Sequence, residues 1–365
     1  MDTVRVVRAD RGAVLVVPAD VPQQPTDQRP HAAEQALDTM DAAAPVRVPL
    51  DHDGLVPDTD GVRLPPTVGD VLVLDASDPG DQPHVDHLVP RRTALVRDTA
   101  GATSREQVLA ANVDVVLVVE HLDPDPSLGR VERLLTLAWR SGAQPVVVLT
   151  KSDLVPDAAS MAAEVASVAP GAPVHAVSVV DGSGLEGLRA LLRPGTTLVM
   201  VGPSGAGKSS LVNALAGHQV METGERRADG RGRHTTTHRE LVPLGDGVLL
   251  IDTPGVRGIG LVADAEALDE TFADVVALAA ACRFADCAHL SEPGCAVLAA
   301  VEEGELPERR LESWRRLARE AAHQARRADA RLAAQERARV RQWSRDVHRS
   351  LRERDRVEGR GTGRR

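Results

Sequence analysis

Gly202-Pro203-Ser204-Gly205-Ala206-Gly207-Lys208-Ser209 decides the fold of this 365-residue chain. The stretch fits the pattern G-x-x-x-x-G-K-[ST], and it lies between an apolar run at 197–201 and a helical pattern at 209–216. Glycines in such a loop let backbone N–H groups surround phosphates, and the helix N-terminus adds positive potential. Lys208 would reach the β- and γ-phosphates, and the Ser209 hydroxyl would bind Mg²⁺. We therefore predict a nucleoside triphosphate site formed by 202–209 and Ser210, rather than a chance glycine-rich turn.

Apolar runs alternate with helical patterns on both sides of this loop. Buried strands are expected at 113–119, 146–149, 174–177, 197–201 and 248–251. Helices are expected between them, at 128–140, 158–168, 185–192 and 209–216. Such an alternation predicts a parallel, doubly wound α/β sheet.

A second motif, Thr150-Lys151-Ser152-Asp153, directly follows the strand expected at 146–149. The Asp153 carboxylate can accept hydrogen bonds from N1–H and the 2-amino group of guanine, whereas adenine has an acceptor at N1 and no amine at C2. The motif resembles the N-K-x-D sequence that reads guanine in GTPases, with Thr150 in place of Asn. Ser178, after 174–177, resembles a weaker motif that packs near guanine, although a plain turn explains it nearly as well.

Lysine usage supports both motifs. Lys151 and Lys208 are the only two lysines of the chain, and arginine serves everywhere else. Lysine is therefore expected where a compact ammonium group on a flexible stem is needed.

Two candidate switches follow the phosphate loop. Asp252-Thr253-Pro254-Gly255 resembles the D-x-x-G switch, in which Asp252 would hold Mg²⁺ through water and the Gly255 amide would meet the γ-phosphate. The glycine-rich basic stretch Gly230–Thr237 fits a mobile switch whose threonine joins the Mg²⁺ ligands, and we take Thr236 for that role, with 235 and 237 as alternatives.

The catalytic residues expected from these motifs are Lys208, Thr236 and His234. Position 256 holds Val where many GTPases have a glutamine that orients water. We therefore expect slow intrinsic hydrolysis, with His234 or a group supplied by a partner completing the site.

The order of the motifs is circularly permuted. In ordinary GTPases the phosphate loop comes first and the base-reading motifs last, whereas here 150–153 and 178 precede 202–209. As a consequence the second switch leads straight into the C-terminal region, so that the nucleotide state could move that region.

All three cysteines lie in one short segment, Cys282-x4-Cys287-x-His289-x5-Cys295. Three thiolates and an imidazole make a tetrahedral Zn²⁺ site, and four protein ligands favour a structural over a catalytic role. The alternative is a group of buried free cysteines beside a chance histidine.

The N-terminal part has a different pattern. Short β-runs at 4–7, 13–17, 71–74 and 93–96 are separated by Pro, Gly and Asp, as in a small all-β barrel, with a loose insertion at about 21–60. We expect three domains: a barrel at 1–97, a GTPase at 98–265, and a zinc-binding domain with an Arg-rich helical tail at 266–365.

Charge is unevenly distributed. The formal net charge is −10, yet the segment from 307 onward holds 19 arginines against nine acidic residues. A basic arm on an acidic body favours nucleic acid over membrane as a partner, and a solvated Arg/Glu helix is the alternative. Aromatic residues make up only 1% of the chain, which favours recognition of RNA phosphates and shape over base stacking.

No apolar run is long enough to cross a bilayer, and the N-terminus lacks the basic and apolar segments of a signal peptide. We therefore expect a cytoplasmic protein, and nothing in the sequence demands more than a monomer.

The permuted motif order, the loop Gly230–Thr237 and the segment Cys282–Val297 together resemble the RsgA family of bacterial ribosome-biogenesis GTPases. Leu88–Arg92 and Ala110–Asp114 look like that family's barrel-to-GTPase junction. The likeness covers nearly the whole chain, except 21–60 and the extreme tail. It implies an N-terminal OB-type barrel, a central permuted GTPase and a C-terminal helical zinc domain. It further implies GTP/GDP and Mg²⁺ as ligands, and GTP hydrolysis stimulated by the small ribosomal subunit, bound through its rRNA, late in maturation.

Two other classes of function remain as alternatives. One is an ATP-dependent motor for transport or DNA handling, which Asp153 argues against and nucleotide preference would separate. The other is an RNA chaperone in which nucleotide is only a structural ligand, which Lys208, Ser209 and Asp252 argue against and measurable turnover would exclude.

Overall fold

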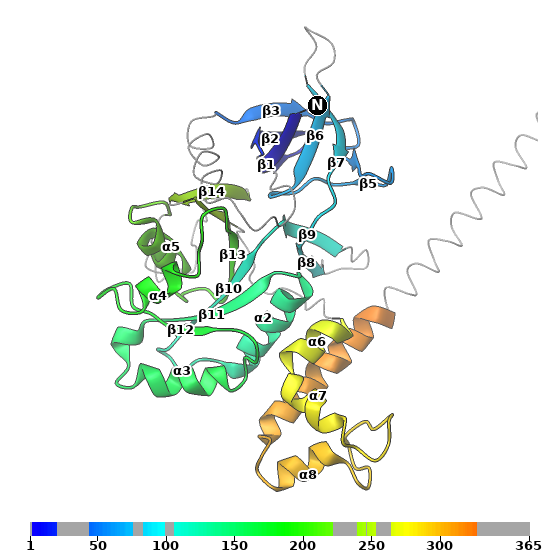
Figure 1. Ribbon diagram of the computed structural model, residues 1–365, viewed down its shortest axis with the longest axis vertical. Coiled ribbons are helices and arrows are strands. Elements are labelled where there is room, and N and C mark those ends of the chain that lie inside the picture. Colours follow the sequence, from blue (N-terminus) through cyan, green and yellow to red (C-terminus); the bar gives the residue numbers. More distant parts are fainter. Residues whose placement is uncertain are drawn as a thin grey trace, which may run out of the picture. The chain divides into compact units, whose positions relative to one another are not determined.

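The structure is a computed structural model that describes residues 2–19, 44–75, 83–98, 106–221, 239–245, 247–252 and 264–326 (Figure 1). By its contacts the chain divides into one unit at Met1–Leu317 and another at Ala318–Arg365. In the described residues no helix is long and apolar enough to cross a membrane.

A six-stranded sheet carries the strands that end at the predicted motifs. Its order is β12 (Val174–Ala176), β11 (Gln144–Thr150), β10 (Val115–His121), β13 (Thr197–Val201), β15 (Val248–Asp252) and β14 (Glu240–Gly245). Neighbouring strands run parallel except β14, which is antiparallel to β15. The strand that leads into the phosphate loop, β13, therefore lies inside the sheet with a parallel neighbour on each side.

Helices cover both faces of this sheet, because apolar residues of a strand alternate between its faces. Val116 and Val118 of β10 belong to the buried cluster with Leu135 of α2 (Leu128–Arg140) and Val165 of α3 (Ala158–Ala166). Val115, Leu117 and Val119, which point to the other face of β10, pack in a second cluster with α4 (Leu185–Arg189) and α5 (Lys208–Ala216). The doubly wound α/β fold predicted from the sequence is confirmed.

The N-terminal residues form a five-stranded antiparallel sheet. Its order is β3 (Val46–Pro49), β2 (Ala13–Pro18), β1 (Asp2–Asp10), β6 (Val71–Asp75) and β7 (His84–Leu88). A meander of three strands whose first strand also pairs with the fourth is the arrangement of an OB-type fold. Inward residues such as Val6, Val14 and Leu72 form its core.

Two details of the N-terminal prediction are corrected. The strand expected at 93–96 is β8 (Ala94–Asp98), which pairs with β9 (Glu106–Ala111) in a separate ribbon. The expected insertion at 21–60 contains β3, and β4 (Val56–Pro57) pairs with β5 (Arg63–Leu64). These strands gave little signal because they are short and mostly exposed, with only Val48 of β3 buried. Within that insertion, 20–43 lies outside the described residues.

Asn112 fastens the N-terminal sheet to the GTPase sheet. Its side-chain amide donates to the Gly69 carbonyl at 2.9 Å, and its Oδ1 accepts from the Arg92 amide at 2.9 Å. Arg5 of β1 donates to the Thr197 hydroxyl at 2.7 Å, at the start of β13. The junction suggested by the segments at 88–92 and 110–114 therefore holds the two sheets together through side chains.

The C-terminal part is helical. It contains α6 (Ala265–Thr271), α7 (Ala273–Ala279), α8 (Ala296–Glu302) and a helix that begins at 308 and is described to 326. The Arg-rich tail beyond 326 lies outside the described residues.

Candidate functional site

The phosphate loop joins β13 to α5 as the sequence predicts. Gly202 has a φ of 150°, and a Cβ there would lie 2.1 Å from the Val119 carbonyl oxygen. The loop therefore needs glycine at this position to pass so close to β10. At the other end Gly207, which has no side chain, is the N-cap of α5, so that the first amides of the helix face the loop without a capping side chain.

Lys208 bends back over this loop. Its Nζ donates to the carbonyl oxygens of Gly202 at 2.9 Å and Pro203 at 2.7 Å. The ammonium group is thus held at the mouth of the loop, with Ser209 and Ser210 next to it in the first turn of α5. Together, amides at a helix N-terminus and an ammonium group make a site suited to phosphate.

The base-reading loop, residues 150–153, lies beside the phosphate loop. Thr150 is 3% exposed, and its Oγ1 donates to the Ala206 carbonyl oxygen at 2.8 Å. Lys151 has a φ of 62°, and its Nζ donates to the Asp123 carbonyl at 3.1 Å. Ser152 and the exposed Asp153 lie in a short 3₁₀ helix, Ser152–Leu154. The structure therefore brings the two predicted nucleotide motifs together, with Thr150 as the direct link.

Ser178 supports the turn next to this loop. It is fully buried, and its Oγ accepts from the amides of Val180 at 3.1 Å and Asp181 at 3.4 Å. Ser183 of the same turn lies 3.4 Å from Ser152 through their hydroxyl oxygens. Ser178 therefore acts as a turn residue in this structure, and its turn contacts the base-reading loop through Ser183.

Part of the predicted site falls outside the described residues. Gly255 and the expected catalytic pair His234 and Thr236 lie there, as does Val256. Asp252 is the last residue of β15, next to β13, so its backbone stands at the same sheet edge as the phosphate loop.

The cysteine cluster is formed. Ligand atoms of Cys282, Cys287, His289 and Cys295 all lie within 4.8 Å of one another. His289 Nδ1 is 3.4 Å from Cys295 Sγ and 3.6 Å from Cys282 Sγ, and the two sulfurs are 3.9 Å apart. A zinc tetrahedron with ordinary Zn–S and Zn–N bonds has edges of about 3.6–3.8 Å. The residues present therefore fit Zn²⁺.

Surrounding residues hold the residues of the cysteine cluster in place. The His289 carbonyl accepts a hydrogen bond from Arg315, and its ring packs edge-on against Trp314 with centroids 5.5 Å apart. Burial raises the pKa of the Cys287 thiol to about 11. Burial acts in the same direction on Cys282, but hydrogen bonds from the Val297 and Ala296 amides and from the Cys295 and Cys287 side chains together lower the pKa of that thiol. Bound Zn²⁺ would favour the thiolate form of each of these cysteines.

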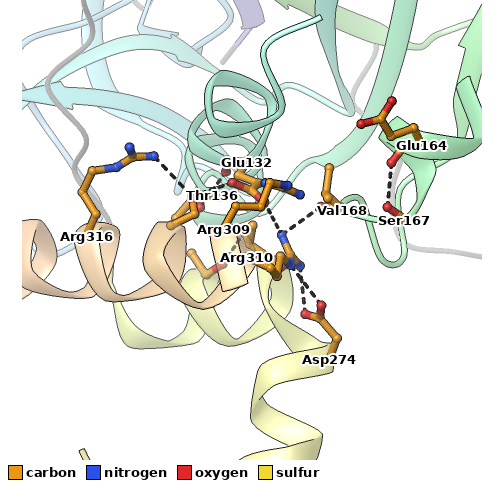
Figure 2. Close-up of polar contacts among 12 residues, drawn as sticks. Glu132, Thr136, Glu164, Ser167, Val168, Asp274, Arg309, Arg310 and Arg316 are labelled. Atoms are coloured by element: carbon orange, nitrogen blue, oxygen red, sulfur yellow. Dashed lines mark hydrogen bonds and ion pairs between the residues drawn. The ribbon is translucent and has the colours of Figure 1, made fainter. Parts of the chain in front are cut away.

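Sequence reasoning missed a buried ionic cluster on α2 (Figure 2). Glu132 is fully buried and accepts from Arg310 Nη1 at 2.9 Å, from Arg309 at 3.1 Å and from the Ser313 hydroxyl. Arg310, 1% exposed, also donates twice to Asp274, at 3.0 and 2.9 Å. In the sequence each of these residues looks like an ordinary charged position on a helix, so no local signal could have found the cluster.

Comparisons with known proteins agree with this arrangement. The model of the RsgA GTPase family matches residues 88–262. Proteins named small ribosomal subunit biogenesis GTPase RsgA are similar to most of the chain. That of Streptomyces avermitilis is 53% identical over 281 residues, which is 76% of this chain and 74% of the relative. That of Opitutus terrae is 50% identical over 275 residues, 75% of this chain and 74% of the relative.

Solved structures show the same fold. YjeQ from Thermotoga maritima matches with a TM-score of 0.61 and 25% identity, over 88% of this chain and 98% of that one. YloQ, described as a circularly permuted GTPase, matches with a TM-score of 0.60 and 23% identity, over 89% of this chain and 96% of that one. Together with the permuted motif order and the six-stranded sheet, this similarity shows that the chain belongs to the RsgA family and is a circularly permuted GTPase that hydrolyses GTP.

Proposed function

We propose that this GTPase acts in late maturation of the small ribosomal subunit in the cytoplasm, as a monomer, and that the subunit stimulates its GTP hydrolysis. The proposal is carried by the similarity to proteins named small ribosomal subunit biogenesis GTPase RsgA, with which this chain shares about half of its residues over about three quarters of both chains. The arginine excess from 307 onward supports an RNA partner, because arginine pairs with phosphate in two parallel hydrogen bonds.

In this proposal each nucleotide motif has a separate task. Backbone amides of 202–207 and the Lys208 ammonium hold the phosphates, and Ser209, Thr236 and Asp252 hold Mg²⁺. Mg²⁺, when bound, would neutralise charge on the β- and γ-phosphate oxygens. Asp153 reads guanine, with Lys151, Ser152 and the turn of Ser178 shaping the pocket around it. The Gly255 amide reports on the γ-phosphate, and His234 or a group of the partner completes the hydrolytic site.

We further propose the domain limits 1–97, 98–265 and 266–365, with a structural zinc ion at Cys282, Cys287, His289 and Cys295. The zinc ion would cross-link a segment with little regular structure between α7 and α8. A small lobe of this kind gains folding free energy from its metal.

Coupling between nucleotide and the zinc-binding domain is part of the same proposal. The predicted switch at 252–255 precedes α6 in the chain, and the buried Glu132–Arg310 cluster ties the C-terminal helices to α2 of the GTPase. Arg310 also donates to the carbonyl oxygens of Val168 at 3.3 Å and Thr271 at 2.8 Å, and it stacks 4.2 Å from the ring centroid of Phe272. A change on one side of this cluster would therefore strain the other.

The test is GTP turnover by the full-length protein, alone and with purified small ribosomal subunits, with ATP as control. We expect slow turnover that the subunit accelerates strongly, and no turnover of ATP. If the subunit leaves turnover unchanged, the ribosomal assignment is wrong and another RNA has to be sought, while the GTPase activity stands.

A further inference from the structure

A short segment at the end of β10, residues 120–123, contacts the base-reading loop, as do the phosphate loop and the turn that contains Ser183. We call residues 120–123 the support segment. Leu122 donates its amide to the Thr150 carbonyl at 3.0 Å, and Lys151 Nζ donates to the Asp123 carbonyl at 3.1 Å. Two of the hydrogen bonds that position the base-reading loop therefore come from the support segment.

An ion pair between a buried carboxylate and a partly exposed arginine fixes the support segment. The Glu120 side chain is fully buried, and its Oε2 accepts from Arg130 Nε at 2.6 Å while its Oε1 accepts from Arg130 Nη2 at 3.0 Å. His121 adds its backbone amide at 3.3 Å and its Nε2 at 3.5 Å from the same Oε1. A two-pronged contact from the planar guanidinium sets both the distance and the orientation of the carboxylate. Arg130 lies in the first turn of α2, so this pair ties the end of β10 to the helix that follows it.

We propose that Glu120 and Arg130 are positioning residues for guanine recognition, acting through the support segment on the base-reading loop. The inference rests on the proposed reading of guanine by Asp153. A carboxylate that must accept from both N1–H and the 2-amino group tolerates little displacement, since a misplacement of about 1 Å can cost about a hundredfold in rate. The phosphates are held by the loop between β13 and α5, which Thr150 links to the base-reading loop. The pair therefore acts first on base selectivity and less on the chemical step.

The pair is tested with the double variant Glu120→Gln/Arg130→Met of the full chain. Removing both charges avoids leaving a buried carboxylate without its partner, which a single Arg130→Met would do. Arg130→Lys keeps the charge and loses the two-pronged geometry. Glu164→Gln, at an exposed glutamate of α3, is the matched control. Thermal unfolding confirms that each variant is folded.

The readout is kcat/KM for GTP divided by kcat/KM for inosine triphosphate, which keeps N1–H and lacks the 2-amino group. We expect the wild type and Glu164→Gln to prefer GTP, and the double variant to lose about tenfold of that preference. We expect its kcat at saturating GTP to stay within about twofold of the wild type, since the phosphate contacts are unchanged. Arg130→Lys should fall between the two.

Each result separates the two levels of the proposal. A wild type that prefers GTP, combined with a folded double variant of unchanged preference, overturns the positioning role and leaves guanine reading intact. A wild type that does not distinguish GTP from inosine triphosphate and ATP overturns guanine reading by Asp153 and this inference with it. If the double variant does not fold, Arg130→Lys decides by the same ratio.

Discussion

Thr150 occupies the position where the guanine-reading motif of GTPases usually has Asn, and its contacts explain how the substitution is accommodated. The hydroxyl carries a single proton, and it lies 2.8 Å from the Ala206 carbonyl and 3.2 Å from that of Glu120. The shorter contact takes the proton. The base-reading loop is thereby fastened directly to the phosphate loop.

Replacing Thr150 by Val, which has the same shape and no donor, should weaken this link. The buried Ala206 carbonyl would lose its partner, at a cost of about 1–3 kcal/mol. We expect the dissociation constant for GDP to rise by about tenfold or more, measured by titration with a fluorescent GDP analogue. Thr150→Ser keeps the hydroxyl and should bind nearly as the wild type does. Equal affinity for the Val and Ser variants would show that the hydroxyl has no part in nucleotide binding.

Residues could be predicted from the sequence where the ligand itself dictates residue type and spacing. The stretches 202–209 and 150–153 are of this kind, and so is the cluster from 282 to 295. Glu120, Arg130 and Arg310 could not be predicted, because a buried carboxylate meets its guanidinium partner only when the fold packs one element against another. Arg310 and Glu132, for example, are separated by 178 positions along the chain.

At the scale of elements, predictability follows the number of buried residues in each strand. β10, β11 and β13 are buried nearly throughout, so their sequences are continuous apolar runs, and β13 was predicted with its observed limits. β3 and β14 are edge strands, with exposed residues that break the pattern. Edge strands need less apolar surface, so their sequences lack the continuous apolar run that predicts a strand.

The loop that contains the proposed zinc ligands is closed by a carboxylate. Glu292 accepts from the amides of Leu290 at 2.7 Å, Ser291 at 3.0 Å and Ala288 at 3.0 Å. The Leu290 amide, followed by those of Glu292 itself and Ser291, lowers the pKa of Glu292 from 4.5 to about 2. The stabilisation by the carboxylate is therefore complete above pH 4.5 and is lost only as the pH falls towards 2.

Glu292→Gln should release zinc more readily, since a neutral oxygen is a weaker acceptor for three amides. We expect its zinc affinity, measured by competition with a chromophoric chelator, to be several-fold lower than that of the wild type. The ratio between the two proteins should stay constant from pH 5.5 to 8, because Glu292 remains ionised throughout. A ratio that approaches one as the pH falls from 8 to 5.5 would contradict the depressed pKa. Glu303→Gln, in an exposed position at the end of α8, is the control.

At the scale of the unit Met1–Leu317, α2 contributes to two ion pairs within one turn, one through an arginine and one through a glutamate. Arg130 holds Glu120 under the base-reading loop, and Glu132 receives Arg310 from the C-terminal helices. Two residues apart on a helix, these side chains point to different sides of α2. The helix therefore contacts both the support segment and the C-terminal helices, and it offers a route between the nucleotide motifs and the cysteine cluster that does not depend on the switches.

Arg310 is the residue at which this route can be cut. Arg310→Met alone would leave Glu132 buried with fewer donors, at a cost of about 3–5 kcal/mol, so the double variant Glu132→Gln/Arg310→Met is the better tool. Allosteric coupling of about 1–3 kcal/mol is typical, and it is reciprocal. We expect removal of zinc by a chelator to change the GDP dissociation constant of the wild type several-fold, and GDP to slow zinc loss correspondingly. In the double variant, the ratio of GDP dissociation constants with and without zinc and the ratio of zinc-loss rates with and without GDP should both approach one. If zinc removal leaves GDP affinity unchanged in the wild type, the two sites are not coupled. If the effect persists undiminished in a folded double variant, the coupling runs through the switches and not through α2.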